Sequence, residues 1–176
     1  MVKLRQSVRK YDSRPVEKEK VLRCLEAARL APSASNSQPW TFVVVDDPAL
    51  KDKVAKETFD TIARFNKFTV QAPVLVVFVI ERPKLITQIG AAIKNKEYPL
   101  IDIGIAAEHF CLQAAGEGLG TCMLGWFNEK PIKELLKIPE KKTIGLVVTL
   151  GYPEDDYPLR EKIRKKFDKV VKFNSY

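Results

Sequence analysis

The sequence has few of the residues on which metal centres and catalytic triads depend. Its 176 residues include one histidine, His109, and three cysteines, none of them in a CxxC pair. A histidine-rich zinc site is excluded, and a Ser-His-Asp triad would have only one possible base. Because an odd number of unpaired cysteines favours free thiols in a reducing compartment, we expect a cytoplasmic protein.

Long apolar runs, linkers and repeats are also missing. The longest wholly apolar stretch, Ala72 to Ile80, is far shorter than the ~20 residues needed to span a membrane. The first residues are charged and contain no apolar signal segment. No Gly/Ser linker or internal repeat divides the chain, and 45% hydrophobic with 30% charged residues is a globular composition. We therefore expect one soluble domain, residues 1–176, with no membrane partner.

The common nucleotide-binding motifs are absent as well. There is no GxxxxGK[ST] sequence, so a P-loop nucleotide hydrolase is unsupported. Gly116, Gly118 and Gly120 superficially resemble a dinucleotide motif, but they follow a predicted helix and lead into a predicted strand. That is the reverse of the order that a Rossmann domain requires, so the sequence argues against one.

What the sequence has in excess is positive charge. Its 30 lysines and arginines outnumber 22 aspartates and glutamates, and the basic residues gather at both ends of the chain. These clusters are Lys3, Arg5, Arg9, Lys10 and Arg14 at one end, and Arg160, Lys162, Arg164, Lys165, Lys166, Lys169 and Lys172 at the other. An anionic partner fits such clusters: a nucleic acid, an acidic surface or a phosphorylated small molecule. Two interpretations stay open here: the two ends converge on one anion, or they are two solvated termini.

Hydrophobic periodicity and the positions of proline predict alternating helices and strands. The predicted helices span 16–30, 48 to about 65, 99–117 and 129–137, and the predicted strands span 40–45, 74–80, 121–126 and 143–150. The helix at 99–117 is apolar nearly all round, so we expect it to be central and buried, with His109 as an interior or interface residue. These elements predict an α+β fold, with helices around a small central sheet.

Three segments are candidates for binding. In the first, Arg5, Ser7 and Arg9 alternate, so an extended backbone puts two guanidiniums and a hydroxyl on one face, which suits a phosphate. The second, Pro32–Trp40, offers hydroxyls, amides and backbone groups to a polar heterocycle, although its composition alone is that of an ordinary connection. The third, Gly118–Trp126, contains glycines that let a planar group approach the backbone.

In this order and at these separations, the segments resemble the nitroreductase family of flavin enzymes. The resemblance covers nearly the whole chain. It rests on the RxSxR opening at Arg5, the PSxxNxQPWxF loop at Pro32 to Phe42, the apolar run after Pro73, the DxGxAA helix from Asp102, the AxxxGLGTC run at Ala114 to Cys122 and the GYP…KxRK tail from Gly151 to Lys165. It implies a central, mostly antiparallel sheet surrounded by helices, in a domain-entwined homodimer that binds FMN non-covalently at the subunit interface.

The resemblance also implies which residues bind the cofactor. They are Arg5, Ser7, Arg9, Lys162 and Arg164 for the phosphate and ribityl chain; Pro32, Ser33, Ala34 and Asn36 for the ring, from the partner subunit; Leu124 and Gly125 for backbone contacts to the ring; and Lys67, near Arg64, for a further contact. Residues 160–176 resemble an arm that reaches the partner subunit. Ala34 stands where many relatives have a second serine, and Leu124 where an acidic residue is common, so only backbone contacts are expected there.

The implied activity is that of an FMN-dependent oxidoreductase. Hydride passes from NADH or NADPH to flavin N5 and then to an electron-poor small molecule, a nitroaromatic or a quinone, in a ping-pong cycle. The flavin carries the chemistry, so neither a catalytic side chain nor a metal is expected. One alternative keeps the fold but performs reductive dehalogenation or flavin fragmentation. Another is a basic nucleic-acid-binding protein, but the aromatic platform of a known module is missing, so we expect no nucleic-acid partner.

Overall fold

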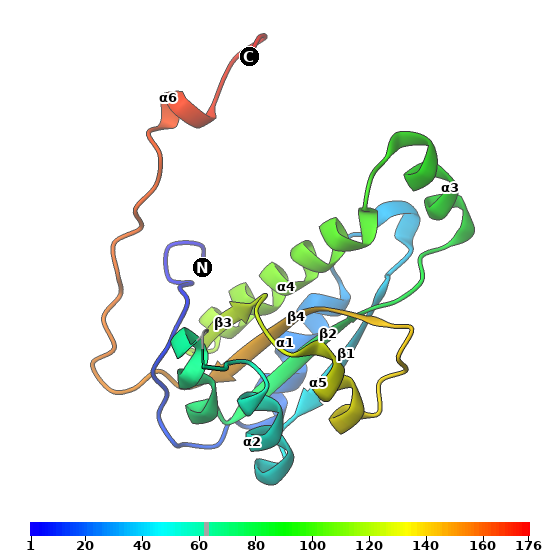
Figure 1. Ribbon diagram of the computed structural model, residues 1–176. Helices are drawn as coiled ribbons and strands as arrows, with labels where there is room; N and C mark the ends of the chain where they lie inside the picture. The colour runs from blue at the N-terminus through cyan, green and yellow to red at the C-terminus, as the bar shows by residue number, and fades with distance from the viewer. Residues whose placement is uncertain (62–63) are drawn as a thin grey trace.

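The computed structural model describes residues 1–61 and 64–176, which are arranged around a four-stranded sheet (Figure 1). The strands are β1 (Trp40–Val45), β2 (Val74–Ile80), β3 (Gly120–Leu124) and β4 (Thr143–Gly151). They lie in the order β1-β2-β4-β3, and every neighbouring pair is antiparallel. The strands predicted at 40–45 and 74–80 are confirmed with their predicted bounds.

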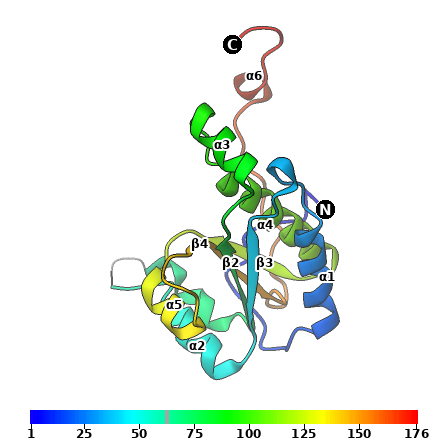
Figure 2. The same cartoon turned by 90° about the vertical axis from the view of Figure 1, so that its right-hand side faces the viewer.

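The composition of β2 explains its place inside the sheet. Six of its seven residues are buried, because helices cover both faces. One face is covered by α1 (Lys18–Arg29) and α4 (Tyr98–Gly116), and the other by α2 (Pro48–Lys56), the 3₁₀ helix η2 (Arg64–Gln71) and α5 (Glu129–Leu136) (Figure 2). Alternate residues of β2 therefore enter two separate cores: Phe78 packs edge-on against Phe110 of α4, whereas Val77 faces the α2 side. The predicted α+β class, with helices around a central antiparallel sheet, is confirmed.

Two helix predictions need correction. The helix predicted from 48 to about 65 is too long, because α2 ends at Lys56 and the hydroxyl of Thr58 then bonds the Ala55 carbonyl (2.7 Å) and the Thr69 hydroxyl (2.8 Å). Positions 62 and 63 of this prediction lie outside the described residues. The helix at 99–117 is not buried all round. Its inner face is buried, but Leu100 and Ile101 are about half exposed (50% and 53%) on its outer face, and His109 is exposed as well.

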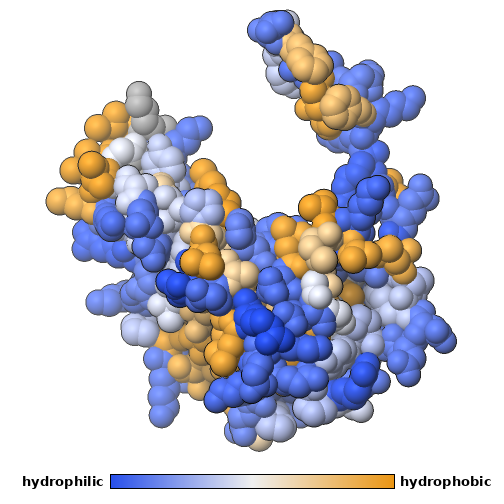
Figure 3. Space-filling view, turned by 180° about the vertical axis from the view of Figure 1, so that it is seen from behind, coloured by the Kyte–Doolittle hydropathy of each residue, from blue (hydrophilic) through white to orange (hydrophobic). Residues whose placement is uncertain are grey.

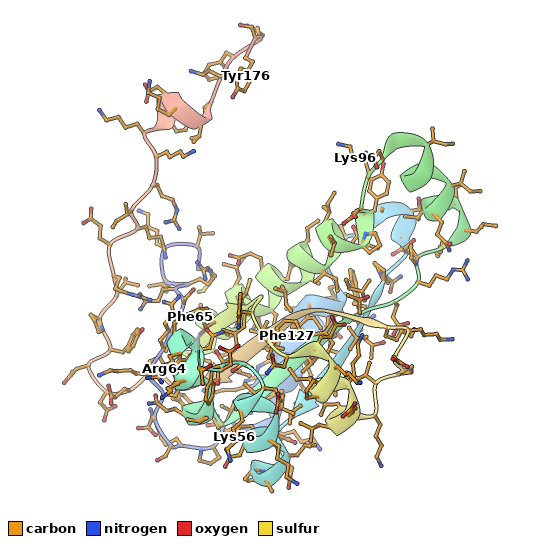
Figure 4. All side chains as sticks on the ribbon, viewed as in Figure 1. Lys56, Arg64, Phe65, Lys96, Phe127 and Tyr176 are labelled. Carbon is orange, nitrogen blue, oxygen red and sulfur yellow. The ribbon has the colours of Figure 1, made fainter. Side chains whose placement is uncertain are left out.

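Three peripheral segments lie outside this body. The first residues of the chain run beside β3, α3 (Leu85–Lys94) projects beyond the start of α4, and the chain after β4 leaves the body as an extended arm that carries the short helix α6 (Phe167–Val170) (Figure 1). The arm ends at Tyr176, well away from the sheet (Figure 4). Within the two described stretches, no helix is long and apolar enough to cross a membrane.

Candidate functional site

The N-terminal segment is held in an extended conformation by the edge strand β3. Ser7 forms a parallel bridge with Thr121, and the Val8 N–H donates to the Thr121 carbonyl at 2.9 Å. Val8 is buried (2% exposed) and lies where a Cβ on Gly120 would stand, at 2.6 Å, so the close approach requires glycine at that position. Arg5, Ser7 and Arg9 line one cavity, described below, but Gln6 lines it too, so strict alternation does not account for the arrangement.

The start of the C-terminal arm is bound to this segment by hydrogen bonds. Gln6 donates through Nε2 to the Pro158 carbonyl (3.0 Å) and accepts the Arg160 N–H through Oε1 (3.1 Å). The Arg160 guanidinium also donates to the Ser7 carbonyl, and the Lys162 ammonium to the Arg5 carbonyl. The two basic ends of the chain therefore converge.

The two segments enclose an open cavity of about 550 Å³, lined by Arg5, Gln6, Ser7, Arg9, Arg160, Glu161, Lys162, Ile163 and Arg164. Five of these nine residues are basic and one is acidic. A volume of this size is typical of a small-molecule site. Guanidinium groups that share one cavity with a hydroxyl are suited to phosphate oxygens, because each guanidinium donates in a bidentate manner.

The charges in this cavity are not balanced by the chain itself. Arg5 forms an ion pair with Glu108 of α4, with Nε 3.4 Å from Oε1, and Glu161 is the other acidic group nearby. Partial burial, followed by the charges of Arg5, Arg164 and Arg160, lowers the pKa of the Lys162 ammonium. An anion entering the cavity would stabilise the protonated form of this lysine, so the surroundings of Lys162 favour an anionic ligand.

The polar loop at 32–38 lies elsewhere on the chain, against α3 and α4. Its middle is the 3₁₀ turn η1 (Ala34–Asn36), and the Ser33 hydroxyl accepts the Gln38 N–H at 2.9 Å. The backbone N–H of Ala34 donates to the Asp102 carboxylate of α4. None of the predicted ring-lining residues Pro32, Ser33, Ala34 and Asn36 belongs to the cationic cavity. The predicted assignment of this loop to the partner's site stays a prediction.

The end of β3 offers an open backbone position. Leu124 is buried (4% exposed), whereas Gly125 is exposed and has no other atom within 4 Å of the place where a Cβ would stand. The turn that follows is fixed by η2, because Asn66 donates through Nδ2 to the Trp126 carbonyl (3.2 Å) and the ring of Phe65 packs edge-on against that of Trp126. Figure 4 shows Arg64 and Phe65 side by side at the start of η2. A planar group therefore has room to approach the backbone at Gly125.

The structure brings together five of the predicted residues, Arg5, Ser7, Arg9, Lys162 and Arg164, and leaves Lys67 exposed on η2, outside the cavity. Sequence reasoning missed Gln6 and Arg160 as the residues that join the two ends. It also gave no role to Asp102, although a carboxylate among apolar residues of a helix expected to be buried was a visible signal. The basic residues of the cavity suit the phosphate of FMN, and the open backbone at Gly125 leaves room for its ring.

Neither Cys122 nor His109 lines the cavity. Cys122 of β3 is 3% exposed, and burial raises the pKa of its thiol, so the thiolate is disfavoured. The exposed His109 contacts the Ile105 carbonyl of its own helix through Nδ1 (2.9 Å) and lies outside the cavity. The described residues contain no cluster of three or more His, Cys, Asp or Glu side chains placed to hold a metal ion.

Comparison with known proteins gives matches over most of the chain. The family model described as "Nitroreductase family" matches residues 2–152. A relative from Archaeoglobus fulgidus described as an NADH dehydrogenase/NAD(P)H nitroreductase is 35% identical over 164 residues, covering 89% of this chain and 85% of the relative. The structure of an FMN-dependent nitroreductase from Clostridium difficile R20291 matches with a TM-score of 0.76 and 29% identity, covering 100% of both chains. An iodotyrosine deiodinase from Thermotoga neapolitana is 25% identical, covering 100% of this chain and 97% of the relative.

Proposed function

The chain belongs to the nitroreductase family, and on that premise we propose that it is an FMN-dependent oxidoreductase that works as a homodimer. Its donor is NADH or NADPH, and its acceptor is an electron-poor small molecule such as a nitroaromatic or a quinone. One observation carries the proposal: the two ends of the chain meet around one cavity with five basic residues. We place the protein in the cytoplasm, since its three cysteines are free thiols.

The chain's own residues bind and orient the cofactor in this proposal. Arg5, Lys162 and Arg164 neutralise the phosphate, and Ser7 adds a hydroxyl beside them. Backbone groups at Leu124 and Gly125 would contact the ring, for which the open position at Gly125 leaves room. When bound, FMN supplies reversible hydride transfer at its N5 atom, so the protein has to position the donor and acceptor rather than move protons itself.

The homodimer follows from apolar side chains that the chain leaves uncovered. The arm carries Ile163, Phe167 and Phe173, which are 88%, 73% and 80% exposed. Apolar residues gather on the arm and on the facing part of the body, and a wide gap lies between them (Figure 3). Apolar side chains left this exposed are typical of a surface that a partner covers. We propose that a second copy fills the gap, so that the loop at Pro32 to Asn36 of one subunit completes the cofactor site of the other.

The visible absorption spectrum tests the proposal. Protein purified without added cofactor, or titrated with FMN, is expected to show the flavin bands, and anaerobic NADH or NADPH is expected to bleach them. A preparation that stays colourless and does not bind added FMN would refute the proposal.

A matched pair of variants tests the assignment of the phosphate. Arg164→Ala removes a cation that lines the cavity, so we expect the FMN dissociation constant to rise about tenfold. Lys169→Ala removes an exposed cation of α6 outside the cavity, so the constant is expected to stay within about twofold. Fluorescence titration of FMN measures both. Equal affinity of the two variants contradicts the assignment.

A second reaction is favoured by one comparison, the full-length similarity to an iodotyrosine deiodinase. In that case the same cofactor site supports reductive removal of a halide from an aromatic substrate. Steady-state oxidation of NADH and NADPH with nitroaromatics, quinones and halogenated phenols, together with halide release, separates the two reactions. A nucleic-acid role predicts instead an affinity for RNA or DNA that falls steeply with salt, which filter binding measures.

A further inference from the structure

The loop between α1 and β1 has an unfavourable backbone conformation. Ser35, Asn36 and Gln38 have φ angles of 52°, 50° and 48°, in the left-handed region that residues other than glycine rarely adopt. Three such residues within four positions raise the conformational free energy of the loop. A conformation of this kind persists only where surrounding groups hold it, so the contacts of the loop indicate what its shape depends on.

The first contact comes from α4. The N–H of Ala34 donates to both carboxylate oxygens of Asp102, at 3.1 and 3.2 Å. Asp102 is 3% exposed and lies on the inner face of α4 beside Ile103 and Ala106, which are also buried. No ion pair of Asp102 occurs among the described residues, and burial raises the pKa of its carboxyl. The carboxylate is therefore buried at an energetic penalty, and the hydrogen bond to the loop is its one described polar contact.

The second contact comes from α3. The Thr87 hydroxyl is 2.8 Å from the Ser37 hydroxyl and donates to the Ala34 carbonyl at 3.3 Å. Thr87 is 3% exposed, and the Ser37 hydroxyl in turn accepts the Lys84 N–H at 3.2 Å. Both backbone polar groups of Ala34 thus contact buried side chains: its N–H bonds Asp102 of α4, and its C=O accepts from Thr87 of α3 as well as from the Ser37 N–H of the loop itself (3.0 Å).

We propose that Asp102 and Thr87 are positioning residues that hold the loop at 33–38 in its left-handed shape before the cofactor binds. The inference rests on the proposed function, in which this loop lines the flavin ring of the partner subunit's site. Ala34 has no polar side chain, so its position depends on its backbone contacts. A loop that is shaped in advance loses less conformational freedom on binding and therefore binds more tightly. In this proposal Asp102 and Thr87 contact the loop and not the cofactor.

The test compares substitutions that remove each contact with substitutions that keep it. Asp102→Ala removes the acceptor, whereas Asp102→Asn keeps an acceptor oxygen without the charge. Thr87→Val removes the hydroxyl at constant shape, whereas Thr87→Ser keeps it. Thr58→Val is the control, because Thr58 is an equally buried threonine (0% exposed) whose hydroxyl bonds Ala55 and Thr69 rather than the loop.

Two quantities are measured on the full-length chain. The first is amide hydrogen exchange of the peptide 33–38 in protein stripped of cofactor, and the second is the FMN dissociation constant by fluorescence titration. We expect Asp102→Ala and Thr87→Val to raise both by about tenfold, the factor that corresponds to one lost hydrogen bond. Asp102→Asn, Thr87→Ser and Thr58→Val are expected to stay within about threefold of the wild type.

Several results overturn the inference. If the amide exchange rate of peptide 33–38 is unchanged in both Asp102→Ala and Thr87→Val, the two contacts do not hold the loop. If Thr58→Val raises that rate as much as they do, the substitutions only loosen the fold in general. If the amide exchange of the loop becomes faster but the FMN dissociation constant is unchanged, the shape of the loop does not affect cofactor binding. Failure of the proposed function is recognised separately, because the wild-type protein itself then binds no FMN; this outcome also overturns the cofactor role of the loop.

Discussion

The body and the arm of this molecule differ in how far they bury side chains of the same kind. In the body, Phe78 and Phe110 are fully buried between the sheet and α4. In the arm, Phe167 and Phe173 are more than two-thirds exposed, although phenylalanine has the same tendency to leave water in both places. The chain buries the apolar side chains of the body and leaves those of the arm exposed, a difference that supports the proposed homodimer.

Polar groups show the same difference. Among the described residues, no buried side-chain nitrogen or oxygen lacks a hydrogen-bond partner. At the cavity near the arm, by contrast, five basic residues face one acidic residue. The unbalanced charge and the uncovered apolar surface therefore lie on the same part of the chain. We therefore expect the body to fold independently of the completed site, and three experiments test this expectation.

Shortening the arm is expected to have the largest effect. The last buried residue of the chain is Gly151, so a chain ending at residue 159 keeps the whole body and is expected to retain a cooperative thermal transition. It loses the cations Arg160, Lys162 and Arg164 together with the apolar residues of the arm, so we expect a monomer that binds no FMN. Sedimentation velocity and the visible spectrum measure both losses.

A chain ending at residue 166 is the matched control for this deletion. It keeps the three cations but lacks Phe167 and Phe173, and we expect it to lose the dimer while an anion still binds at the cavity. If the chain ending at 159 unfolds, or stays a flavin-loaded dimer, then body and periphery are not separable.

A phenylalanine-to-alanine substitution is expected to have different effects on stability in the body and in the arm. Phe110→Ala empties part of the core and is expected to lower the free energy of unfolding by about 3–5 kcal/mol. Phe167→Ala removes an exposed ring and is expected to change the unfolding of the chain itself by less than about 0.5 kcal/mol. Urea denaturation at several protein concentrations measures both.

Concentration dependence distinguishes the two regions in that experiment. Phe110→Ala is expected to shift the midpoint equally at every concentration, whereas Phe167→Ala acts through the dimer and shifts it more at high concentration. Equal shifts at all concentrations for Phe167→Ala would mean that its ring is part of the folded chain and not of an interface.

The body was largely predictable from the sequence. β1 and β2 are runs of β-branched and aromatic residues with turn residues at both ends, so local preference alone defines them. The end of α2 was not predictable, because it depends on Thr58 meeting Thr69 across a segment that has no periodicity of its own. α3 was missed for a similar reason: its placement depends on Thr87 and the loop at 33–38 rather than on a core-facing stripe.

The candidate site was predictable in its chemistry but not in its assembly. Charge clusters at both ends of the chain suggested an anion but left open whether the ends meet, whereas the family resemblance implied that they do, because it assigned Arg5 and Arg164 to one phosphate. They meet through contacts that a charge count does not contain: the Gln6 amide with the backbone of Pro158 and Arg160, and Lys162 with the backbone of Arg5. The loop at Pro32 to Asn36 stays a prediction for the partner's site, since completing it requires a second chain.

The smallest expected effect concerns an ion pair that belongs wholly to the body. Arg23 of α1 binds Glu117, just after α4, through two hydrogen bonds of 2.7 and 2.8 Å. This contact, with help from Gln113, lowers the pKa of the Glu117 carboxyl to about 2. A carboxyl whose pKa is lower in the folded than in the unfolded state stabilises the fold above its unfolded pKa, and that contribution is lost as the pH falls through the folded pKa.

We therefore expect Glu117→Gln to lower the melting temperature at pH 7 and the difference from wild type to shrink between about pH 4.5 and pH 2. Glu26→Gln is the matched control, because Glu26 forms a similar bidentate pair with Arg29 inside one helix and joins no separate elements; its effect is expected to be smaller. Because Glu117 lies outside the cavity and the arm, its pH-dependent contribution should be the same with and without FMN and at every protein concentration. A contribution that changes with FMN or with concentration would show that the body senses the state of the periphery, and the two regions would then have to be treated as one cooperative unit.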